Sequence, residues 1–131
     1  MHSRLIKIIS GLVLFSTVYA TDVSGNITSN TTWTLANSPY VVTGNILVGS
    51  GVTLTIEAGV TIKFDSDKVF QVKGTLIARG TSSSKITFTS NASSPAAGDW
   101  GYLQFFGEST DASYSGSTYT SGSIMEYCIV E

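Results

Sequence analysis

Two aspartates separated by one serine, Asp65-Ser66-Asp67, have the residue types and spacing of a metal-binding pair. Carboxylates at this spacing can place oxygen atoms around Ca²⁺, a hard cation that takes about six to eight oxygen ligands. The competing interpretation is a turn between strands, because an aspartate side chain accepts hydrogen bonds from nearby backbone N–H groups. No further acidic cluster adjoins the pair. The sequence therefore favours a turn and no cofactor, with Asp65 and Asp67 as the candidate Ca²⁺ ligands.

Three tyrosines form the candidate ligand-binding group. Tyr114 and Tyr119 lie in a segment rich in Ser, Gly and Thr that spans residues 107–123, and Tyr102 lies shortly before it. Tyrosine rings can stack on sugars, and binding residues concentrate on loops that a rigid scaffold holds. The alternative for this segment is a polar insertion that binds nothing.

Catalytic chemistry finds little support in the residue inventory. The chain has one histidine, His2, and one cysteine, Cys128, so an intramolecular disulfide is excluded and a cysteine nucleophile has no histidine base beyond position 2. Glycoside hydrolysis requires two carboxylates at a set separation. Nothing in the surrounding sequence singles out a pair from the available carboxylates, which are Glu57, Asp65, Asp67 and Asp99. We therefore assign no catalytic residue.

The first twenty residues have the pattern of a secretory signal peptide. Arg4 and Lys7 form a basic start, an apolar run follows, and Val18-Tyr19-Ala20 offers small residues at the cleavage positions. We expect a mature chain from Thr21 that is secreted or held at the cell surface, with no membrane span after cleavage. Residues 21–131 carry five basic and nine acidic side chains, a formal charge of −4, which argues against a nucleic-acid partner.

The rest of the chain alternates short β-strand patterns with Gly, Asn, Asp and Ser. Leu54/Ile56, Ile62/Phe64 and Ile86/Phe88 each place apolar side chains on one side of a strand. Segments of similar sequence recur: 24–28 resembles 43–47 nineteen residues later, and 55–59 resembles 76–80 twenty-one residues later. A period near twenty predicts one turn of a parallel β-helix per repeat. An immunoglobulin-like sandwich would need longer strands and tight hairpin turns.

These repeats carry a family resemblance. Residues 38–46, 54–64, 74–80 and 86–90, followed by Asp99-Trp100-Gly101-Tyr102-Leu103-Gln104-Phe105, resemble the N-terminal turns of secreted right-handed parallel β-helix repeat proteins of the pectin-lyase-like superfamily. The resemblance covers about residues 33–131. It implies an all-β, single-stranded right-handed parallel β-helix, and it does not fix a function, because the family includes lyases, hydrolases and adhesins.

We therefore expect an N-terminal cap at 21–44 and about three to four turns at 45–131, with a polar loop at 107–123 between strands at 103–106 and 124–130. The expected function is a noncatalytic extracellular or cell-surface scaffold whose partner is a polysaccharide or cell-surface glycan. The alternative is the N-terminal fragment of a polysaccharide lyase or glycoside hydrolase whose catalytic turns are missing. We also expect self-association through an open C-terminal edge, since an unpaired strand edge is a template for another strand.

Overall fold

The computed structural model describes residues 19–131. The predicted signal peptide, residues 1–20, falls almost wholly outside this range. Within the described residues, no helix has the length and apolar character needed to cross a bilayer.

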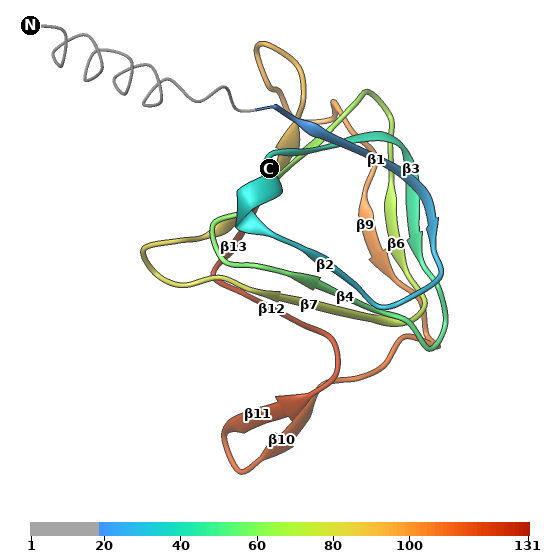
Figure 1. Ribbon diagram of the computed structural model, residues 1–131, viewed down its shortest axis with the longest axis vertical. Coiled ribbons are helices and arrows are strands. Elements are labelled where there is room, and N and C mark those ends of the chain that lie inside the picture. Colours follow the sequence, from blue (N-terminus) through green and yellow to red (C-terminus); the bar gives the residue numbers. More distant parts are fainter. Residues whose placement is uncertain (1–18) are drawn as a thin grey trace, which may run out of the picture.

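The chain winds into a coil with three faces of parallel strands, seen end-on in Figure 1. The first, called the β4 face, contains in spatial order β2 (Thr31–Trp33), β4 (Thr53–Ile56), β7 (Thr75–Arg79) and β12 (Ile124–Glu126). The β5 face consists of the first half of β3 (Tyr40–Val48), then β5 (Thr61–Phe64), β8 (Ile86–Ser90) and β13 (Cys128–Val130). The β6 face consists of the second half of β3, then β6 (Phe70–Val72) and β9 (Leu103–Phe105).

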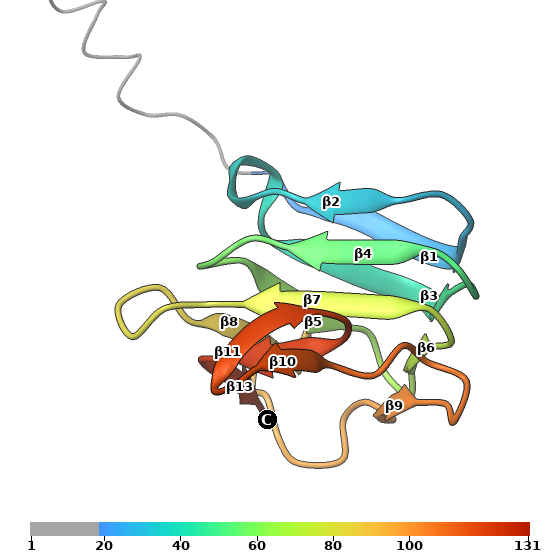
Figure 2. The ribbon, with the colours of Figure 1, turned by 90° about the horizontal axis from the view of Figure 1, so that it is seen from below.

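Strand β1 (Thr21–Ile27) opens the coil and pairs along both halves of β3, with a register shift between Val23 and Gly25. A single 3₁₀ turn, η1 (Leu35–Asn37), connects β2 to β3. Figure 2 shows the successive turns stacked on one another. The parallel β-helix expected from the sequence is thus confirmed.

The strands form because alternate residues are apolar and point into the coil. Leu54, Ile56, Ile62, Phe64 and Phe88 are at most 1% exposed, as their alternation predicts. Full burial of one such side chain stabilises the fold by about 1.5–3 kcal/mol.

Aromatic rings run along the core. Trp33 stacks on Tyr40 at 4.9 Å between ring centroids, and Phe70 meets Phe64 and Phe88 edge-on. Trp100, beyond β8, stacks on Phe64 at 4.0 Å, and its indole N–H donates to the Glu131 carbonyl at 2.9 Å. These rings pack the turns together with the geometry that aromatic pairs prefer.

Side chains at the corners of one turn fasten the strands of the next. The Thr53 N–H donates to Asn30 Oδ1 at 2.9 Å, the Thr61 N–H to Ser38 Oγ at 2.9 Å, and the Val69 N–H to Asn45 Oδ1 at 3.1 Å. The separations are 23, 23 and 24 residues, about one turn of the coil. A side chain of the preceding turn therefore accepts a hydrogen bond from a backbone N–H at or next to the start of each of the strands β4, β5 and β6.

The expected registers differ from those in the structure. Gly25 pairs with Ile46 and Ile56 with Ala78, whereas the two sequence repeats aligned these residues with Gly44 and Ile77. The corners between strands vary in length, so segments of similar sequence need not stack on one another. As a consequence, Asn26 pairs with Leu47 and does not form a side-chain ladder with Asn45, which occupies the equivalent position in the repeat.

Two local expectations also change. The single strand expected at 124–130 is divided into β12 and β13 at Tyr127, whose φ of 49° turns the chain from the β4 face to the β5 face. The segment 107–123, expected as a loop, contains an antiparallel hairpin of β10 (Ser113–Ser115) and β11 (Thr118–Ser121). This hairpin projects from the coil beside β12 (Figure 1).

Candidate functional site

Asp65 and Asp67 lie in a turn between β5 and β6, as the turn interpretation predicts. The Lys68 N–H donates to the Asp65 carbonyl at 3.2 Å, and Asp67 has a φ of 63°. The Asp67 side chain accepts a hydrogen bond from the Ser66 hydroxyl at 3.2 Å. These contacts belong to the turn itself, and the Asp67 N–H also donates to the Asp99 carbonyl oxygen at 3.0 Å, outside the turn.

The structure joins Asp65 to Asn91 across two turns of the coil. Phe64 pairs with Ser90 in the β5 face, so the residues that follow them lie at the same corner. The Asn91 amide donates to Asp65 Oδ1 at 2.8 Å. One oxygen of the Asp65 carboxylate therefore links neighbouring turns.

Asp65 shares an open pocket of about 310 Å³ with Asp99 rather than with Asp67. The other lining residues are Phe64, Ser66, Ser90, Asn91 and Ala92. Asp99 comes from the segment between β8 and β9. No sequence motif marked it as a partner of Asp65, because the corner that brings them together is an irregular loop.

The environment of Asp99 favours its ionised form. The Ser90 hydroxyl and the Ala96 N–H, which donates at 2.8 Å, hold the pKa of this carboxyl below its usual value. An ionised carboxylate accepts hydrogen bonds but cannot serve as a general acid. Among residues 19–131, no three His, Cys, Asp or Glu residues gather in the manner of a metal site.

The hairpin brings Tyr114 and Tyr119 together. They are cross-strand partners, with ring centroids 6.0 Å apart and the rings inclined at 75°. Tyr114 is 56% exposed, while Tyr119 is partly buried. Tyr114 is thus the ring that this pair presents to solvent.

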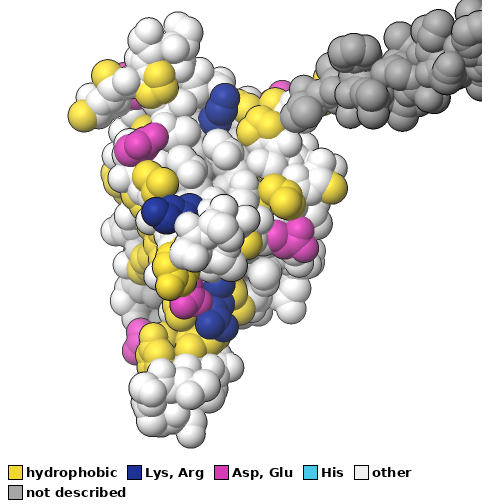
Figure 3. Space-filling model, turned by 90° about the vertical axis from the view of Figure 1, so that its left-hand side faces the viewer, with side chains coloured by type: hydrophobic (Ala, Val, Ile, Leu, Met, Phe, Trp, Pro, Cys, Tyr) yellow, Lys and Arg dark blue, Asp and Glu magenta, His cyan; other side chains and the backbone are white. Residues whose placement is uncertain are grey.

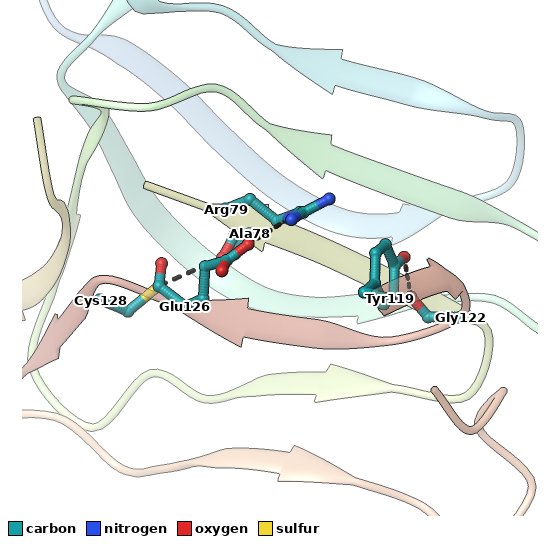
Figure 4. Close-up of polar contacts among 6 residues, drawn as sticks. All are labelled: Ala78, Arg79, Tyr119, Gly122, Glu126 and Cys128. Carbon is teal, nitrogen blue, oxygen red and sulfur yellow. Dashed lines mark hydrogen bonds and ion pairs between the residues drawn. The ribbon is translucent and has the colours of Figure 1, made fainter. Parts of the chain in front are cut away.

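Tyr119 anchors the hairpin to the coil. Its ring lies 4.7 Å from the Arg79 guanidinium, and its hydroxyl donates to the Gly122 carbonyl at 2.6 Å. Arg79 is in turn paired with Glu126 of β12 (Figure 4). The base of the hairpin is therefore fixed by a cation–π contact and an ion pair, which limits how Tyr114 can be oriented.

Tyr102 belongs to a different part of the surface. It precedes β9, and its carbonyl accepts a hydrogen bond from the Phe70 N–H at 2.8 Å on the β6 face. Its side chain is 50% exposed. The structure brings two of the three expected tyrosines together and places the third at the edge of another face.

Around the tyrosine pair, the hairpin surface is uncharged. Residues 112–125 contain no Asp, Glu, Lys or Arg, and they expose several hydroxyl-bearing side chains, namely Ser113, Ser115, Ser117, Thr118, Thr120 and Ser121. In Figure 3 the hairpin, at the bottom of the view, is white and yellow, and the charged side chains lie above it. An aromatic ring among hydroxyl groups can contact both faces and edges of a polyhydroxylated ligand.

A second pocket, of about 320 Å³, lies where the hairpin joins the coil. Phe105, Ile124 and Met125 supply its apolar wall, while Ser109, Thr110, Asp111, Ala112 and Ser123 supply the rest. The Ser123 N–H donates to the Thr110 carbonyl at 3.0 Å, which closes the insertion at its root.

Cys128 is half-buried in β13, and burial raises the pKa of its thiol. Its thiol donates a hydrogen bond to the Ala78 carbonyl oxygen, with 3.4 Å between Sγ and the oxygen (Figure 4). A raised pKa lowers the thiolate fraction at neutral pH, which is the opposite of what a nucleophile needs.

Comparison with known proteins gives one family. Residues 25–126 match the model of a pectate-lyase-like β-helix domain. A curated relative, Protein bark beetle of Drosophila melanogaster, is 38% identical over 77 residues, which cover 59% of this chain and 2% of the relative. The chain thus spans a very small part of that protein. No solved structure matches the chain.

Proposed function

Because the chain belongs to the family of pectate-lyase-like β-helix domains, we propose that it is a noncatalytic extracellular or cell-surface scaffold that binds a polysaccharide or cell-surface glycan. The hairpin of β10 and β11, called here the tyrosine hairpin (residues 113–121), is the proposed binding element. The family alone does not supply this function, since one fold hosts many activities.

The observation that carries the proposal is the presentation of Tyr114. Tyr114 is 56% exposed at the side of the coil, and the Arg79–Tyr119 contact and the Arg79–Glu126 pair fix the base of the hairpin. A rigid aromatic side chain contributes contact area while losing little conformational entropy on binding.

The state of Asp99 argues against its being a general acid. The pKa of its carboxyl is held below the usual value, whereas the general acid of a hydrolytic carboxylate pair needs a raised pKa. Asp65 accepts a hydrogen bond from Asn91 that links two turns. The pocket that Asp65 and Asp99 line is the observation that favours an enzyme as the second candidate.

Binding of the exported chain to immobilised glycans tests the proposal. We expect binding that Tyr114→Ala weakens and Tyr102→Ala leaves unchanged, because the two residues are similarly exposed and only Tyr114 lies on the hairpin. Equal binding by both variants and the unsubstituted chain would exclude the tyrosine hairpin as the binding element.

Mass spectrometry of the same exported material tests the signal peptide and should find the N-terminus at Thr21.

A further inference from the structure

The two cations beside the root of the tyrosine hairpin are both neutralised. Arg79 pairs with Glu126, which follows the hairpin, and the Lys73 ammonium lies 3.5 Å from the Glu108 carboxylate, which precedes it. Lys73 also lies 5.3 Å from the centre of the Phe106 ring. Each end of the inserted segment is thus fastened to the preceding turn by an ion pair and a cation–π contact.

The local charge balance is negative. Glu108 and Glu126 flank the hairpin on its two sides. A third acidic residue, Asp111, lines the pocket at the root of the hairpin. Among residues 19–131 no cation lies within ion-pair distance of Asp111; the two ion pairs found there are Lys73–Glu108 and Arg79–Glu126. Three acidic groups and two basic groups therefore surround the root, and the hairpin adds no charge of its own.

The rings of Tyr114 and Tyr119 differ in what covers them. The Arg79 guanidinium lies over the Tyr119 ring, while the Tyr114 ring is inclined at 75° to that of Tyr119 and the residue is more than half exposed. The exposed ring is flanked in sequence by Ser113 and Ser115, whose side chains are also exposed. The surface offered to a ligand is an aromatic face bordered by hydroxyl groups.

We propose, on the basis of the function above, that the tyrosine hairpin selects neutral glycans over acidic ones. The apolar C–H face of a neutral sugar stacks on Tyr114, and the sugar hydroxyls exchange hydrogen bonds with the serine and threonine hydroxyls. A uronate or sulfate group brought to the same surface loses hydration without meeting a free cation, and Asp111 repels it. Acidic glycans are therefore disfavoured because no free cation at this surface offsets the lost hydration of their charged groups.

The test uses the whole exported chain and two sets of oligosaccharides of equal length, one neutral and one containing uronic acid or sulfate. Binding is measured by calorimetry at low and at physiological salt. We expect neutral oligosaccharides to bind at least about tenfold more tightly, a difference of about 1.4 kcal/mol, with little dependence on salt. Tyr114→Ala should weaken this binding by about the same factor, and Tyr114→Phe should preserve it.

A charge-releasing variant gives the second measurement. Glu108→Gln removes the partner of Lys73 and keeps residues 113–121 and their contact with Arg79, so acidic oligosaccharides should gain affinity while neutral ones do not. Thermal melting of each variant confirms that it is folded.

The outcomes separate the two proposals. Tyr114-dependent binding of acidic oligosaccharides, weakened by salt, would overturn the selectivity and leave the glycan-binding function standing. If neither set binds in a Tyr114-dependent manner, the proposed function itself fails.

Discussion

Removing three corner side chains that fasten the first turn of the coil to the second should lower stability by a predictable amount. Asn30, Ser38 and Asn45 accept hydrogen bonds from the Thr53, Thr61 and Val69 N–H groups. The substitutions Asn30→Ala, Ser38→Ala and Asn45→Ala remove the acceptors and leave the strands and the apolar core unchanged.

Each loss should cost about 1 kcal/mol, the net contribution of a typical intramolecular hydrogen bond. The three acceptors lie at different corners, so their effects should add to about 3 kcal/mol. Small domains have a total stability of about 5–15 kcal/mol, and the triple variant should therefore still fold. At about 4 °C per kcal/mol, its Tm should fall by about 12 °C.

Thermal unfolding followed by far-ultraviolet circular dichroism measures the effect, with Asn26→Ala as the matched control. Asn26 is exposed and pairs with Leu47, so its loss should leave the Tm within about 2 °C of that of the unsubstituted chain. The reasoning fails if the triple variant melts with the control, or if Asn26→Ala is as destabilising as Asn45→Ala.

Four further predictions concern packing, thiol chemistry, turnover and assembly. Gly74→Ala should destabilise the chain by about 3 kcal/mol or more, because its Cβ would lie 2.2 Å from the Val52 carbonyl oxygen; Gly107→Ala, with nothing within 4 Å, should be neutral in the same melting assay. Alkylation of Cys128 in the folded chain should require a higher pH than alkylation of the urea-unfolded chain, since burial raises the pKa of the thiol; coincident pH profiles would contradict this. Residues 21–131 should release no reducing or unsaturated sugar from neutral or acidic polysaccharides with or without Ca²⁺, and turnover that Asp65→Ala or Asp67→Ala abolishes would reveal an active site. The same chain should self-associate in sedimentation experiments, because Phe105 is 38% and Val130 52% exposed although their strand partners Val72 and Phe88 are fully buried; a single sharp monomer species would refute this.

Strand identity was predictable from the sequence because alternation reports directly on burial. Leu54, Ile62 and Phe88 point into the core, and the residue before each of them in its strand is more exposed. Register was not predictable from similarity between repeats. Ile77 looks like a core residue, yet it pairs with Thr55 on the outward side because Leu76 and Ala78 occupy the core. A shift of one residue reverses every side chain, and corners of variable length permit such shifts.

The site residues were predictable only where they share a local segment. Tyr114 and Tyr119 lie five residues apart and meet across a hairpin, although the loop expected there had no strands. Asp65 and Asp99 are brought together by an irregular loop whose path no pattern of alternation encodes. Tyr102 is close to the hairpin in sequence, but β9 separates it from the insertion.

The way the tyrosine hairpin enters the coil bears on how recognition could diversify in this architecture. The insertion leaves β9 and returns at β12, and its root is closed by the hydrogen bonds from Thr110 to Gly74 and from Ser123 to Thr110. None of residues 113–121 belongs to the buried core. Replacing them exchanges the contact surface while the buried core keeps its sequence. This position is a natural graft point, where variation or design can change ligand choice without the stability cost that limits substitutions in the core.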